Sequence, residues 1–141
     1  MQKTRKPLIF ILMLGAAVLS LGLLQQHPIQ IEHQPSATRL NTLGAAQWPT
    51  WQKEVSHFDW LFLDEEIAYV LEGEVTITPG LGAANYGQPF TIKAGDLITF
   101  PAGIETHWHV TKPFLKRVTH NENKFYAFYQ RVILKIRRTF N

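Results

Sequence analysis

The sequence contains no cysteine, which excludes disulfide frameworks, thiolate metal sites and cysteine nucleophiles. Charged residues are also sparse, at 18% of the 141 residues, against 45% hydrophobic residues. A chain of this length and composition is too short for two comfortable hydrophobic cores, so we expect one folded domain with terminal extensions. The absence of cysteine is compatible with either side of a membrane, so the compartment has to be inferred from other features.

The central part of the chain lacks positive charge. The net charge is +3, but three cations lie in the first six residues, and the last 21 residues carry five basic side chains and one acidic one. The residues between therefore have a net charge of about −4. Nucleic-acid-binding domains concentrate basic residues on the folded body, because neutralising phosphates supplies most of the affinity. We therefore expect no nucleic-acid partner.

One stretch, Leu8 to Leu24, has no charged residue at all. As a helix it would span roughly 25 Å, close to the roughly 30 Å of a bilayer core. Residues 1–27 are thus predicted to form a hydrophobic helix that acts as a single-pass membrane anchor, and the preceding cations predict a cytoplasmic amino terminus. Two alternatives stay open. The stretch would be a signal cleaved after Ser20-Leu21-Gly22, giving a secreted or periplasmic protein, or translation would start later, for instance at Met13.

Residues 28–119 show short β-branched and aromatic runs separated by glycine and proline. One short helix is expected between the N-cap candidate Ser36 and Gly44. Short strands with tight turns predict an all-β barrel or sandwich for this region. The clearest predicted strands are Ile67 to Thr78, Leu97 to Phe100, His107 to Thr111 and Leu115 to Thr119.

The final segment, residues 120–141, changes to a helical period. Apolar residues recur there at spacings of three and four, with basic residues largely between them: Phe125, Phe128, Tyr129, Val132 and Ile136. This pattern predicts a C-terminal amphipathic helix. The helix would pack across the barrel mouth or against a partner; alternatively it would lie on a membrane surface with its cations facing anionic lipid.

Two spaced motifs occur among the predicted strands. They are Glu66-x6-Gly73 and Gly95-x5-Pro101-x-Gly103, with glycines where turns need unusual backbone angles. Both resemble halves of the two motifs of the cupin superfamily. The stretches WPTWQKEV, YVLEGEVTITP and IKAGDLITFPAG resemble, more narrowly, small cupins that group with (S)-ureidoglycine aminohydrolase domains. The resemblance implies a cupin double-stranded β-barrel, or jelly roll, from about Ile29 to Val118, and a homodimer as one possible assembly.

The metal ligands implied by this resemblance are largely missing. Metal-binding cupins take two histidines and a glutamate from the first motif and one histidine from the second. Of these four ligands only Glu66 remains, and one carboxylate does not hold a transition metal against water. We therefore expect no metal and no cofactor. The histidine positions hold Asp59 and Leu61, or Trp60 and Phe62 in the shorter register, and Thr106.

His107 and His109 offer a fallback metal site together with Glu66, since residues i and i+2 of a strand share a face. Strand parity opposes it. If position 106 faces inward, Thr106 and Trp108 lie inside the barrel and both histidines lie outside, unless a bulge inverts the order. His57 and His120 are lone histidines, and both are expected to be solvated.

Without a metal, the predicted pocket is aromatic and contains one acid. Glu66 is the candidate catalytic residue, because a buried carboxyl group among aromatic rings suits general acid–base chemistry; a structural hydrogen bond, for instance to Tyr69, is the alternative. The resemblance to small cupins implies that Lys116 lies near the mouth, either paired with Glu66 or a substrate carboxylate, or simply solvated. The predicted ligand-binding residues are Trp60, Phe62, Tyr69, Thr106, Trp108 and Lys116.

The sequence leaves open whether the protein is an enzyme. The first hypothesis is a membrane-tethered cupin that binds a small polar metabolite between aromatic walls without the usual metal. The second, implied by the resemblance, is a hydrolase or isomerase acting on a small ureido, amino or carboxylated compound. The third is a structural or dimerisation module.

Overall fold

The computed structural model describes residues 12–16, 26–121 and 124–140, with side chains for all of these except residues 124–127. Most of the predicted anchor, Leu8 to Leu24, lies outside these residues, and its residues 12–16 are helical. None of the helices in the described ranges is long and apolar enough to cross a membrane.

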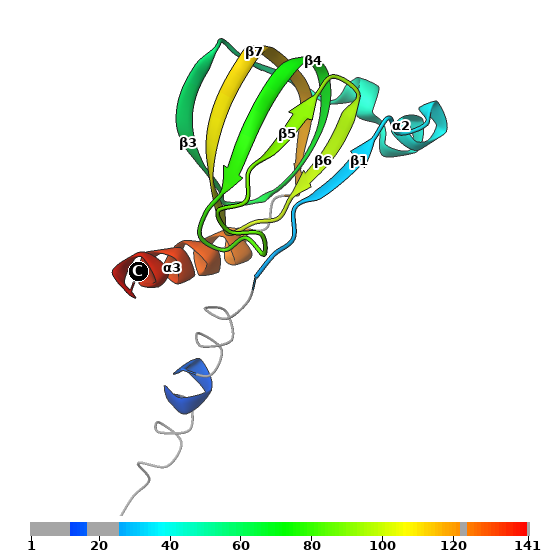
Figure 1. Ribbon diagram of the computed structural model, residues 1–141. Helices are drawn as coiled ribbons and strands as arrows, with labels where there is room; N and C mark the ends of the chain where they lie inside the picture. Colours follow the sequence, from blue (N-terminus) through cyan, green and yellow to red (C-terminus); the bar gives the residue numbers. More distant parts are fainter. Residues whose placement is uncertain (1–11, 17–25, 122–123, 141) are drawn as a thin grey trace, which may run out of the picture.

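Strands make up the body of the described part of the chain (Figure 1). They are β1 (Gln30–His33), β2 (Thr50–Lys53), β3 (Ser56–Phe62), β4 (Glu65–Pro79), β5 (Phe90–Lys93), β6 (Asp96–Phe100) and β7 (Ile104–Asn121). The predicted short helix is confirmed as α2 (Ala37–Leu43), followed by the 3₁₀ turn η1 (Ala45–Gln47). Ser36 caps α2 by accepting a hydrogen bond from the backbone of Arg39, and Gly44 ends it in the left-handed conformation.

The two long strands, β4 and β7, pair with each other antiparallel along almost their whole length. The first half of β4 also pairs with β6, and its second half pairs with β5. Likewise β3 pairs with the first half of β7 and β2 with its second half. Each long strand therefore belongs to two sheets that face each other, which is the double-stranded barrel that the sequence predicts (Figure 1).

The bend of β4 occurs at Gly73, where the β4–β7 register shifts. Gly73 has a φ of 88°, which side chains rarely adopt, and a Cβ there would lie 2.1 Å from the carbonyl oxygen of Pro113. Only glycine combines this backbone angle with so close an approach of the second strand.

Apolar side chains from both sheets fill the barrel. Phe62 is 2% exposed and stacks on Phe100 with ring centroids 4.3 Å apart, and Trp108 is buried in the same cluster. The strands thus bury this apolar core between themselves, without a second layer of helices along the sheets in the described part of the chain.

The C-terminal helix α3 (Lys124–Phe140) covers one end of the barrel (Figure 1). Its buried residues are Gln130, Ile133 and Leu134, whereas Phe128 is 64% exposed. The C-terminal helix is therefore confirmed, but the predicted packing face is wrong, because the buried residues are not those of the predicted apolar stripe. The apolar residues cover more than half of its circumference, so the sequence period did not single out the face that packs.

We predict that Gly73→Ala destabilises the full-length chain by more than about 2 kcal/mol, because it adds backbone strain to a clash with Pro113. Gly87→Ala is the matched control: its φ is also positive, at 74°, but its Cβ would meet no atom within 4 Å. It should cost only about 1 kcal/mol. Urea unfolding measures both, and equal losses would contradict this account of the corner.

Candidate functional site

Glu66 lies on the inner face of β4, where it alternates with outward-facing residues. It is 3% exposed, and the next residues on the same face are the fully buried Ala68 and Val70. Its cross-strand neighbours are Phe100 on β6 and His120 on β7. A carboxylate in such apolar surroundings is costly unless the fold supplies partners for it.

Lys116 supplies the main partner. Its side chain is 5% exposed, and its Nζ donates a hydrogen bond to Oε1 of Glu66 in a buried ion pair. The second carboxylate oxygen, Oε2, lies 3.1 Å from Nε2 of His120, whose side chain is 46% exposed. Glu66 thus connects a buried amine to a histidine at the surface.

Aromatic rings surround the amine of Lys116. Its Nζ lies 4.8 Å from the ring centroid of Trp51 and 5.1 Å from that of Trp108, within the range of cation–π attraction. Burial lowers the pKa of Lys116 below its usual value, and the neighbouring Glu66 carboxylate opposes the shift. Burial therefore favours the neutral amine, whereas the carboxylate of Glu66 favours the protonated one.

These groups face a small cavity between the two sheets, which we call the Glu66 pocket. Its volume is about 110 Å³, which is the space of roughly three or four water molecules. Trp60, which is 46% exposed, lies at its opening. This volume has room for a molecule of only a few non-hydrogen atoms. Its lining residues are Trp51, Phe58, Trp60, Glu66, Trp108, Lys116, Val118 and His120.

Four of the residues expected from the sequence line this pocket: Trp60, Glu66, Trp108 and Lys116. Three others do not. Phe62 belongs to the apolar core. Tyr69 lies on the opposite face of β4 from Glu66, because it is three positions further along a strand whose side chains alternate between the faces. Thr106 is 3% exposed and lies beneath the pocket wall rather than in it.

Thr106 binds two residues of the pocket wall, Trp60 and Trp108. Its hydroxyl donates a hydrogen bond to the backbone oxygen of Trp60 at 3.0 Å and accepts one from the indole N–H of Trp108 at 2.8 Å. The residue therefore fixes the orientation of the Trp108 ring and ties β3 to β7.

Sequence reasoning missed four lining residues, Trp51, Phe58, Val118 and His120. Trp51 and Phe58 come from the strands on either side of the turn between β2 and β3, and neither was predicted to reach the pocket. His120 was expected to be solvated, yet it shares a face of β7 with Lys116 and pairs in register with Glu66. Counting in steps of two from Lys116 is the signal that identifies it.

His107 and His109 lie on the outside of the barrel, as strand parity predicts, while Thr106 and Trp108 are buried. Nδ1 of His107 lies 2.7 Å from a carboxylate oxygen of Asp59, and His109 stacks on His57 with ring centroids 3.9 Å apart. The fallback set of Glu66, His107 and His109 is therefore not brought together. In the part of the chain that the structure describes, no group of three or more histidine, aspartate or glutamate residues is arranged to hold a metal.

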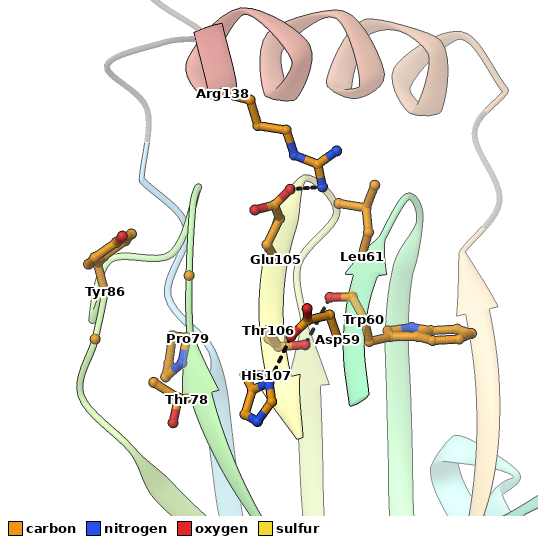
Figure 2. Close-up of a pocket in the computed structure, with 12 residues that line it drawn as sticks. Asp59, Trp60, Leu61, Thr78, Pro79, Tyr86, Glu105, Thr106, His107 and Arg138 are labelled. Carbon is orange, nitrogen blue, oxygen red and sulfur yellow. Dashed lines mark hydrogen bonds and ion pairs between the residues drawn. The ribbon is translucent and has the colours of Figure 1, made fainter. Parts of the chain in front are cut away.

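A larger hollow of about 460 Å³ lies outside the barrel, between β3, β7, the loop after β4 and α3. Figure 2 shows that its polar side chains bind one another, His107 to Asp59 and Arg138 to Glu105. These charges lie largely exposed at the surface, whereas Glu66 and Lys116 are buried, so the Glu66 pocket is the stronger candidate site.

Residues 40–118 match the family described as the EutQ-like cupin domain. The chain belongs to this cupin family. Its finer resemblance to ureidoglycine aminohydrolase domains stays a prediction.

The chain is similar to three solved structures, of which the first supports the fold. A DUF861 family protein from Thermotoga maritima is 38% identical with a TM-score of 0.60, over 66% of this chain and 99% of that chain. The EutQ protein of Clostridium difficile is 21% identical with a TM-score of 0.45, over 53% of this chain and 55% of that one. A putative ethanolamine utilization protein Q from Salmonella typhimurium is 24% identical with a TM-score of 0.43, over 50% and 53%. No curated protein matches the chain.

The residues at the metal positions of this cupin do not fit a metal ion. Thr106 commits its hydroxyl to two neighbours, and both oxygens of Glu66 contact the amine of Lys116 or the ring of His120. The amine of Lys116 thus contacts Glu66, the one acid that remains of the metal ligands implied by the cupin motifs.

We predict that Glu66→Gln and Lys116→Met each destabilise the full-length cupin by about 3–5 kcal/mol, because each leaves a buried charge without its partner. The double variant should lose less than the sum of the two, by more than about 1 kcal/mol, since neither charge then remains. Urea unfolding measures the cycle. Lys112→Met is the control, as Lys112 lies on the same strand with its side chain 68% exposed. Additive losses would contradict a coupled pair.

Proposed function

We propose that this cupin is a membrane-attached protein that binds a small polar metabolite in the Glu66 pocket. The observation that carries the proposal is the buried Glu66–Lys116 pair at the wall of a cavity lined by aromatic rings. Two charges inside a barrel cost desolvation free energy, which a purely structural core avoids with apolar residues of the same size. A pocket that has to recognise a polar molecule needs such groups.

The chemistry of the wall indicates which ligands fit. An ammonium group has three donors, and the contact with Glu66 uses one of them. A carboxylate or carbonyl oxygen of the ligand would accept from Lys116, and the half-exposed ring of His120 offers a further polar contact. The tryptophan rings would stack on a planar ligand. We therefore favour small planar carboxylates, amides and ureido compounds.

Membrane attachment is the second part of the proposal, through the hydrophobic stretch Leu8 to Leu24. The position of the chain that follows this stretch supports it. His27 joins the barrel by backbone hydrogen bonds with Gly82 and Ala84, and Gln26 and Phe140 line one hollow beside the end of α3. The exposed cations of α3 would then lie near the membrane, where each contributes about 1 kcal/mol of attraction to anionic lipid.

An enzyme is the alternative function: a hydrolase or isomerase for a small ureido, amino or carboxylated compound, as in ureidoglycine aminohydrolase. The observation that favours it is the connection from Glu66 to solvent through His120, a route by which a proton can leave the pocket. Release of ammonia from ureido compounds by the wild type, and its loss in His120→Ala, would favour this alternative over a binding protein. A structural or dimerisation module is the third possibility, which requires no ligand at all.

We predict that acetate, acetamide or urea at millimolar concentration raises the melting temperature of the full-length cupin, because a ligand of the native state stabilises it by mass action. The gain should shrink in His120→Ala, whose side chain contacts the pocket from the surface. His107→Ala, which changes an exposed histidine outside the barrel, is the matched control and should keep the full gain. No shift with any of the three compounds, or equal shifts in both variants, would count against the binding proposal.

For the anchor, we predict that the protein sediments with membranes and stays there after an alkaline wash, with its original amino terminus intact by mass spectrometry. Release by the wash would contradict attachment through Leu8 to Leu24. A mature chain that begins shortly after Gly22 would instead establish a cleaved signal.

A further inference from the structure

Lys116 differs chemically from an ordinary lysine. Lysine is almost never fully buried, yet this one is 4% exposed, and its amine forms part of the wall of the Glu66 pocket. Tryptophan rings flank it and a carboxylate contacts it. A desolvated lysine beside a proton acceptor is the arrangement that turns an amine into a nucleophile.

We propose that Lys116 forms an imine with a small aldehyde or ketone that enters the Glu66 pocket. The inference rests on the proposed function, since it uses the same pocket, and it narrows the ligand class to carbonyl compounds. The cavity of about 110 Å³ limits these to molecules such as propanal, acetone or pyruvate.

The groups around Lys116 suit each requirement of this reaction. The amine has to lose a proton, and the contact with Glu66 Oε1 provides the acceptor. The site has to keep bulk water away from the imine, and Trp51, Trp108 and Phe58 form the apolar part of its wall. The half-exposed His120, 3.1 Å from the other oxygen of Glu66, connects the acid to solvent.

The steps balance without any further reactant. Lys116 gives one proton to Glu66, and its neutral nitrogen attacks the carbonyl carbon, forming the C–N bond while the carbonyl oxygen takes the proton from Glu66. Glu66 then removes a second proton from the nitrogen and delivers it to the new hydroxyl group. Water leaves as the nitrogen lone pair closes the C=N bond. The product is a protonated imine beside the Glu66 carboxylate, so the charge of the pocket is unchanged.

The proposed reaction requires a lysine at position 116 rather than an arginine. Both would pair with Glu66, but the guanidinium group keeps its proton and forms no imine under these conditions. Lys116→Arg therefore keeps a positive charge beside Glu66 but removes the amine that would form the imine.

The test uses the full-length protein with propanal or pyruvate in the presence of cyanoborohydride, which reduces an imine to a stable amine. Peptide mapping by mass spectrometry then gives the rate of modification of each lysine in the same sample. We expect Lys116 to be modified at least tenfold faster than the exposed Lys112, and Glu66→Gln to slow Lys116 at least tenfold without affecting Lys112. Lys116→Arg should carry no adduct at this position.

Two results would overturn the inference: modification of Lys116 no faster than that of Lys112 in the wild type, or the same rate at Lys116 in Glu66→Gln. Acetate distinguishes this failure from failure of the proposed function, because it fits the pocket and forms no imine. If acetate stabilises the wild type but Lys116 is not trapped, the pocket binds ligands and the imine is wrong. If Lys116 is not trapped and none of acetate, acetamide and urea stabilises the wild type, both proposals fail.

Discussion

The buried contact between Glu66 and Lys116 is the constraint on which the rest of the site depends. Each of the two charges loses several kcal/mol of hydration in the barrel, and only close contact with good partners repays it. Glu66 is satisfied at both oxygens, and Lys116 adds the faces of two tryptophan rings. The side chains around the pair therefore have to stabilise its charges, and the tryptophan rings that do so for Lys116 also line the small cavity.

The bend in the two long strands is what makes this contact face a cavity. β7 contributes Trp108 from the half that pairs with β3, and Lys116 from the half that pairs with β2. These residues lie eight positions apart on one strand, yet they face each other because the strand passes from one sheet to the other. Gly73 and Pro113 form the corner where β4 and β7 approach most closely. Strand curvature, rather than a loop, therefore assembles the pocket.

Local pattern predicted an all-β barrel or sandwich, and the resemblance to cupins implied the double-stranded barrel and the acid Glu66. Alternation from position 106 placed Thr106 and Trp108 inside and His107 and His109 outside. The lining residues that were missed share one physical cause: they reach the pocket through the pairing of strands that are far apart in the sequence. The sequence does not give the register that sets His120 opposite Glu66, nor the turn that brings Trp51 to the pocket.

Other failures came from treating each residue by its type. An aromatic ring on a cupin strand is as suited to a dry core as to a ligand site, so Phe62 and Tyr69 were both expected in the pocket. Phe62 is instead buried in the apolar core, and strand alternation places Tyr69 on the opposite face of β4 from Glu66. The packing face of α3 was ambiguous for a similar reason. Its apolar residues form more than one possible packing face, and only contact with the end of the barrel determines which one is buried. The family match agrees with the fold but does not by itself identify a ligand.

The most direct test of the central claim is a heteronuclear NMR titration of the side-chain nitrogen of Lys116 in the full-length protein. The account predicts that its Nζ protons exchange slowly with water and that Lys116 loses its proton below the usual lysine value of 10.5. In Glu66→Gln the proton should be lost at still lower pH, because the opposing carboxylate is gone. An amine that titrates at the usual value, with protons that exchange as fast as those of a solvated lysine, would contradict the buried pair.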